Sequence, residues 1–121
     1  MKKGTFWTKR QTRYRGKPCV SAAKVDGYQL DGDSFVFKDS DDMWYVVDFG
    51  AGCSFGVGAT RKRAIENAAF NADKLAKLKT SLRYTALCTA FDWVKEKKSK
   101  RMSAKEYNAL VINQHDRIPY V

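Results

Sequence analysis

The sequence predicts an α+β protein: an antiparallel meander of three to four strands, followed by about three helices packed on one face. Between residues 17 and 58, short runs rich in aromatic and β-branched residues alternate with turn sequences. After residue 60, apolar residues recur at helical spacing instead. At 121 residues, the chain has the length of one domain with a single core.

The strands are predicted from local composition. SFVFK (residues 34–38) and MWYVVDF (residues 43–49) flank the turn sequence DSDD and should form a hairpin. A second turn, GAG at residues 50–52, leads into CSFGV as the third strand, and PCVSAAKV at residues 18–25 is a weaker candidate for a fourth.

Alternation divides residues 43–49 into two faces. One face carries Tyr45, Val47 and Phe49, and the other carries Trp44, Val46 and Asp48. The first set is more uniformly apolar, so we assign it to the core.

Three helices are predicted. The first is capped by Thr60, whose hydroxyl can accept a bond from a free N–H of the first turn, and it should run to about residue 79. Residues 82–94 carry the apolar stripe of the second. The S-x-x-E capping box at Ser103 precedes a third over residues 104–115.

The net charge of +10 is the strongest global signal. Residues 1–20 carry +7 and residues 21–50 carry −5, while residues 51–80 and 81–121 carry +4 each. Cations on both sides of an acidic middle indicate an anionic partner: nucleic acid, a nucleoprotein or an acidic protein. Solubility alone is the alternative, although a merely soluble protein more often mixes its charges.

Residues 1–17 are predicted to form a basic aromatic arm ahead of a single domain at residues 18–121. Cations of such an arm neutralise phosphates, and its aromatic rings stack on bases. Alternatively, the aromatic rings pack on the core while the cations stay solvated. The candidate backbone contacts are Lys9, Arg10, Arg13 and Arg15, and the stacking candidates are Trp7 and Tyr14.

The stretch GVGATRKRAIENAA, residues 56–69, places Arg61, Lys62 and Arg63 where a helix N-terminus favours acidic residues. The conflict largely disappears if this turn holds a phosphate, because free N–H groups, the helix dipole and the cations then favour one anion. Alternatively, the side chains bend into solvent and Glu66 offsets part of the charge. A further basic run would extend the patch: Lys97, Lys98, Lys100 and Arg101.

Residues 44–76 resemble the C-terminal half of a double-stranded RNA-binding domain. In that family, a Gly-x-Gly-like turn leads into a helix opening Ser/Thr-Lys-Lys-x-Ala, whose first-turn lysines touch phosphates. The resemblance implies the same role for Arg61 and Lys62, but Ile65 stands where the family has a basic residue. The matching residues are Gly56, Gly58, Thr60, Arg61, Lys62, Ala64, Ala68 and Ala69.

The same run also resembles one found in small phage proteins of unassigned role. That resemblance implies an alternative function, a phage-encoded inhibitor of a host defence protein or complex of the anti-CRISPR type. Because this chain is basic, such an inhibitor would bind guide RNA, DNA or an acidic protein face.

Other chemistries fit the sequence poorly. The acidic stretch at residues 31–42 has Val36 at the position where a calcium loop needs glycine, and the glycines of the chain form no nucleotide-binding motif. An enzyme pairing His115, the only histidine, with a cysteine is the weakest alternative. We therefore expect a cytoplasmic, non-enzymatic protein with no cofactor, metal, membrane association or small-molecule substrate. Its cysteines should be reduced thiols: Cys19, Cys53 and Cys88.

Overall fold

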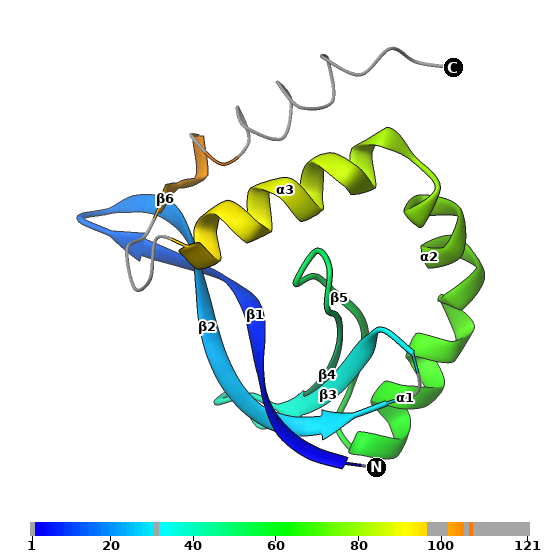
Figure 1. Ribbon diagram of the computed structural model, residues 1–121. Coiled ribbons are helices and arrows are strands. Elements are labelled where there is room, and N and C mark those ends of the chain that lie inside the picture. The colour runs from blue at the N-terminus through cyan, green and yellow to red at the C-terminus, as the bar shows by residue number, and fades with distance from the viewer. Residues whose placement is uncertain (1, 31, 97–101, 106, 108–121) are drawn as a thin grey trace.

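The computed structural model describes residues 2–30, 32–96, 102–105 and 107 (Figure 1). It has the predicted α+β class, with five antiparallel strands in the order β1-β2-β3-β4-β5, a short β6 paired to β2, and three helices. The elements are β1 (Lys2–Tyr14), β2 (Lys17–Gln29), β3 (Ser34–Lys38), β4 (Trp44–Asp48), β5 (Ser54–Gly58), α1 (Arg61–Phe70), α2 (Ala72–Lys79), α3 (Leu82–Glu96) and β6 (Met102–Ser103).

The segment expected as an arm is instead strand β1, which explains the additional strand. β1 pairs with β2 along its whole length, from Lys2 opposite Gln29 to Tyr14 opposite Lys17. Their two-residue turn has positive φ at both positions, 51° at Arg15 and 76° at Gly16, as tight hairpins favour. Lysines and arginines occupy both faces of β1, so the sequence lacks the apolar alternation that marks a strand.

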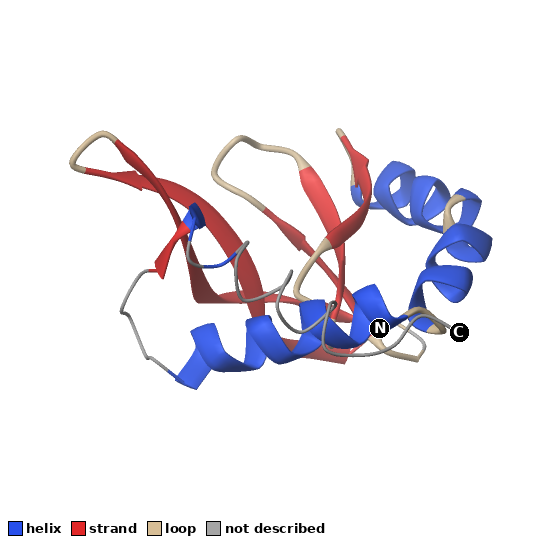
Figure 2. Cartoon of the chain, turned by 90° about the horizontal axis from the view of Figure 1, so that it is seen from above, coloured by secondary structure: helices blue, strands red, loops and turns tan. Residues whose placement is uncertain are grey.

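The sheet is strongly curved, and helices line two adjoining sides of it (Figures 1 and 2). The curvature brings the loop between β4 and β5 back to β1, where the Lys9 N–H donates to the Gly52 carbonyl at 3.1 Å. This hydrogen bond joins parts of the chain that are distant in sequence.

Both faces of the sheet contribute residues to the core. One face packs Val36 and Val46 against Ala64 and Ala68 of α1, and it continues over β2 to α3. The opposite face gathers a hydrophobic cluster around Phe35, in which the rings of Phe6, Phe37 and Phe49 pack together with Val47. The assignment of only one face of β4 to the core was therefore wrong, because α1 covers the other.

Two glycines allow α1 to lie close to β5. A Cβ atom at Gly56 would lie 2.6 Å from both the Ala64 carbonyl oxygen and the Ala68 Cβ atom. A Cβ atom at Gly58 would lie 2.6 Å from the Ala64 nitrogen. Any side chain at either position would push the helix off the strand. These glycines therefore fix where the first turn of α1 stands.

The long helix predicted from Thr60 is divided at Asn71. The Asn71 side chain donates to the Phe55 carbonyl at 2.9 Å, and that of Asn67 donates to the Val57 carbonyl at 2.7 Å. Both acceptors belong to β5, the last strand in the sheet order. The apolar periodicity continues through Asn71, so the break follows from tertiary contacts that the sequence does not display.

The predicted second helix is confirmed as α3. Of the third, residues 104 and 105 are helical and Tyr107 is buried as expected, packing near Val20 of β2. The remainder of that helix and His115 lie outside the described residues.

Candidate nucleic-acid interface

The first turn of α1 presents three exposed cations. Thr60 is the N-cap, as predicted, and its hydroxyl accepts a hydrogen bond from the Arg63 N–H at 3.1 Å. No acidic residue lies in this turn. Arg63 is 3.6 Å from Glu66, but both side chains are largely exposed, so the pair contributes little. Lys62 has no ion-pair partner within the described part of the chain, and its charge faces solvent.

Tyr28 joins this turn to β1. The Arg61 guanidinium lies 5.0 Å from the centre of the Tyr28 ring, and the Lys3 ammonium lies 5.9 Å from it. Lys3 stands directly opposite Tyr28 in the β1–β2 register. In Figure 1 the N-terminus accordingly lies beside the start of α1. Sequence reasoning missed Lys3 and Tyr28, because only the strand register brings them to Arg61.

A second cation–aromatic pair lies on the same face of the β1–β2 hairpin. The Lys24 ammonium is 5.2 Å from the centre of the half-buried Trp7 ring. Trp7 is four residues along β1 from Lys3, about 13 Å at the usual rise per residue. Thr5 and Asp26 lie between the pairs and are hydrogen-bonded to each other at 3.2 Å. We call the combined surface the basic stripe; its members are Lys3, Trp7, Lys24, Tyr28, Arg61, Lys62 and Arg63.

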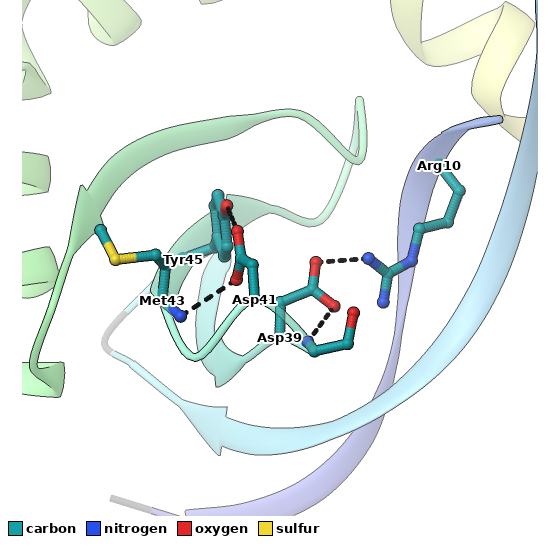
Figure 3. A network of polar contacts seen from close by, with 6 residues as sticks. Arg10, Asp39, Asp41, Met43 and Tyr45 are labelled. Atoms are coloured by element: carbon teal, nitrogen blue, oxygen red, sulfur yellow. Dashed lines mark hydrogen bonds and ion pairs between the residues drawn. The ribbon is translucent and has the colours of Figure 1, made fainter.

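Arg10 lies on the opposite face of β1, in the network that Figure 3 shows. Its guanidinium donates to Asp39 at 2.5 Å and lies 5.6 Å from the Phe37 ring centre. This hydrogen bond holds the pKa of Asp39 below its ordinary value. Asp41 accepts hydrogen bonds from the Met43 N–H and the Tyr45 hydroxyl. Arg10 is therefore paired with a carboxylate. Asp39 and Asp41 accept hydrogen bonds within the turn in which they lie, as expected of aspartates in turns.

The other predicted arm cations are separate from the α1 turn. The Lys9 ammonium lies over the Tyr107 ring, 5.4 Å from its centre. Arg13 donates to the Gly16 carbonyl at 3.2 Å and so braces the hairpin turn that contains Arg15. That turn is at the far end of the hairpin from α1 (Figure 1). The structure therefore does not gather the predicted cations into one patch.

Some of the predicted site residues lie wholly or partly outside the described part of the chain. The side chain of Tyr14 is not among those described, although its backbone ends β1. The whole of the second basic run also lies outside the described residues: Lys97, Lys98, Lys100 and Arg101.

The described residues offer little support for a metal site, a disulfide or a membrane-spanning helix. Three or more potential metal ligands do not come together in that part of the chain. The three cysteines are free, and burial raises the pKa of the Cys88 thiol. Among the helices described, none combines the length and apolar character needed to cross a membrane.

Comparisons with known proteins return no match: neither a family model, a curated protein nor a solved structure corresponds to this chain.

Proposed function

We propose that this chain is a non-enzymatic nucleic-acid-binding protein whose basic stripe contacts the phosphate backbone. The single observation that carries the proposal is the exposed first turn of α1, with Arg61, Lys62 and Arg63 around the free N–H groups of a capped helix. A phosphate there would receive hydrogen bonds from the backbone and from the cations together.

The hairpin extends this surface. Lys3 lies beside Arg61 across the Tyr28 ring, so a second cation approaches the turn from β1. Lys24 and Trp7 continue the stripe with another cation and another aromatic ring. Cations that alternate with aromatic rings suit a single strand of nucleic acid, because the cations can contact its phosphates and the rings can stack on its bases.

The three free thiols are in keeping with a reducing compartment, so we place the protein in the cytoplasm.

The experiment is a salt titration of binding to short duplex RNA, duplex DNA and single strands, followed by fluorescence anisotropy. The plot of log affinity against log salt concentration should be steep for at least one of them. In the variant R61A/K62A/R63A, the slope should shrink by roughly 2 to 3, since each phosphate contact contributes about 0.9.

A matched control removes the same charge elsewhere. Lys74, Lys77 and Arg83 are exposed cations of α2 and α3 outside the basic stripe. The variant K74A/K77A/R83A should keep the wild-type slope. Equal losses in the two triple variants would show that only net charge matters and would overturn the assignment. Weak, unselective binding of nucleic acid together with a stable complex with one host protein would instead support the alternative function, an inhibitor of a host defence complex.

A further inference from the structure

A cavity of about 520 Å³ lies between α1, α2 and the sheet, and no residue of the basic stripe lines it. Residues of α2 line one side of it, and this helix has no fully buried residue. Its walls are largely apolar, with contributions from Leu30, Phe55, Ile65 and Leu75. A cavity of this size and character is typical of a small-molecule site.

One end of the cavity is polar and is formed by Asp48, which is only 1% exposed. Its Oδ2 atom accepts hydrogen bonds from the Ala51 N–H at 3.1 Å and the Tyr84 hydroxyl at 2.5 Å. Burial and the bond to Asp48 raise the pKa of Tyr84 above its ordinary value, so this hydroxyl remains a donor.

The other carboxylate oxygen of Asp48 accepts no hydrogen bond from the described residues. The Lys79 ammonium is 3.3 Å from this Oδ1 atom, which is an ion-pair distance without hydrogen-bond geometry. A buried carboxylate oxygen without a donor is costly, and native proteins rarely leave one unsatisfied. A donor from a bound molecule would remove that cost.

The charges around this end favour a cationic donor. Lys79 is shared between Asp48 and Asp33, whose carboxylate is 3.6 Å from the same ammonium and largely exposed. Two carboxylates therefore face one ammonium, which leaves a local excess of one negative charge within a chain of net charge +10. A second ammonium can occupy this position favourably.

We infer that this cavity binds a small molecule with an apolar tail and an ammonium head group, which donates to Asp48 Oδ1 while the tail lies along Leu75 and Ile65. The site is independent of the proposed nucleic-acid interface, and its test does not require nucleic acid. A hydroxyl head group would satisfy the oxygen without its charge, and a carboxylate head group would be repelled. These alternatives define the probes.

The test compares three six-carbon probes: hexylamine in its protonated form, hexanol and hexanoate. Binding is measured from backbone amide shifts in two-dimensional NMR spectra. Hexylammonium should bind at least about tenfold more tightly than hexanol, because a charged hydrogen bond replaces a neutral one. Hexanoate should not bind. The perturbed amides should belong to β4 and α2 and not to the β1–β2 hairpin.

Two pairs of variants complete the test. Ala72→Phe fills the cavity and should abolish binding of hexylammonium, whereas Leu78→Phe, at an exposed α2 position outside the lining, should not. Lys79→Met removes the competing ammonium, so hexylammonium should bind more tightly and raise the melting temperature more than in the wild type. Asp33→Asn removes an exposed carboxylate and should reduce the ratio between the affinity for hexylammonium and the affinity for hexanol.

Equal affinity for the three probes would overturn the inference. So would binding that survives Ala72→Phe, or affinity for hexylammonium that falls in Lys79→Met.

Discussion

The cations of the α1 turn and Arg10 of β1 both lie in basic stretches of the sequence, but their surroundings differ in the structure. Arg61, Lys62 and Arg63 are exposed at a helix start, and the strongest carboxylate contact among them is a solvent-exposed pair at 3.6 Å. Arg10 is only 31% exposed and is hydrogen-bonded to Asp39 at 2.5 Å. The number of cations in a segment therefore does not decide which contacts they make within the chain, because that depends on the face on which each one lies.

The scaffolds of the two groups also differ. The α1 turn stands where it does because Gly56 and Gly58 let the helix approach β5. Arg10 is directed at Asp39 because the pairing of β1 with β2 places it on the same face as Phe6 and Phe37. One group can therefore be disturbed without the other.

The largest effect is expected from removing the support of the α1 turn. Gly56→Ala places a methyl group 2.6 Å from backbone and side-chain atoms of α1, and should lower the free energy of unfolding by about 3 kcal/mol. Chemical denaturation followed by circular dichroism measures it. Gly16→Ala meets no atom within 4 Å and is strained only by its positive φ, so about 1 kcal/mol is expected there. If Gly56→Ala proved as mild as Gly16→Ala, the close packing of α1 on β5 would be refuted.

The next effect separates stability from binding. Arg10→Ala leaves Asp39, whose side chain is 18% exposed, without its guanidinium and should cost about 1.5 kcal/mol of stability. Its affinity for nucleic acid at fixed salt should stay close to that of the wild type. Arg61→Ala should show the reverse, with reduced affinity and a stability change within about 0.5 kcal/mol. Equal losses of affinity in both variants would erase the distinction between the two groups.

The same contrast predicts a dependence on pH. Arg10 holds the pKa of Asp39 below its ordinary value of 3.8, so the carboxylate contributes stability above that pH. This contribution is lost as the pH falls below 3.8 toward the lowered pKa, because the unfolded chain then binds the proton more readily. The stability difference between wild type and Arg10→Ala should therefore shrink on acidification, as urea titrations at a series of pH values would reveal. A difference that stayed constant would assign the effect of Arg10 to packing alone.

The smallest effect on stability is expected at Tyr107, whose ring makes a cation–π contact with the Lys9 ammonium. Its buried hydroxyl has no hydrogen-bond partner among the described residues, so Tyr107→Phe should stabilise the protein slightly, by up to about 1 kcal/mol. Burial also raises the pKa of Tyr107 to about 12. The wild type should consequently lose stability as the pH rises from 10 toward 12, because the unfolded chain releases the proton first. That loss should be smaller in Tyr107→Phe, and an unchanged alkaline profile would argue against a buried hydroxyl.

Local chemistry allowed much of the fold to be predicted. The strands around Phe35 and Val46 and the cap at Thr60 depend on residues adjacent in sequence, and these predictions are confirmed. β1 was missed because cations on both of its faces hide the alternation, and the break at Asn71 depends on a β5 carbonyl.

The candidate site could be predicted from the sequence only in part, for the same reason. The cations of the α1 turn form a contiguous cluster, so the sequence displays them. Lys3 and Tyr28 are 25 positions apart and meet only through the strand register. The burial of Asp48 likewise depends on α3, which supplies the Tyr84 hydroxyl.

The amides of Asn67 and Asn71 have a consequence for how copies of this chain coexist at high concentration. A strand from a neighbouring molecule that approached β5 would find the Val57 and Phe55 carbonyls already occupied. Two copies meeting through β1 would oppose five lysines and arginines with five more of the same sign. The molecule can thus carry a long strand at its border and still resist polymerising into fibres.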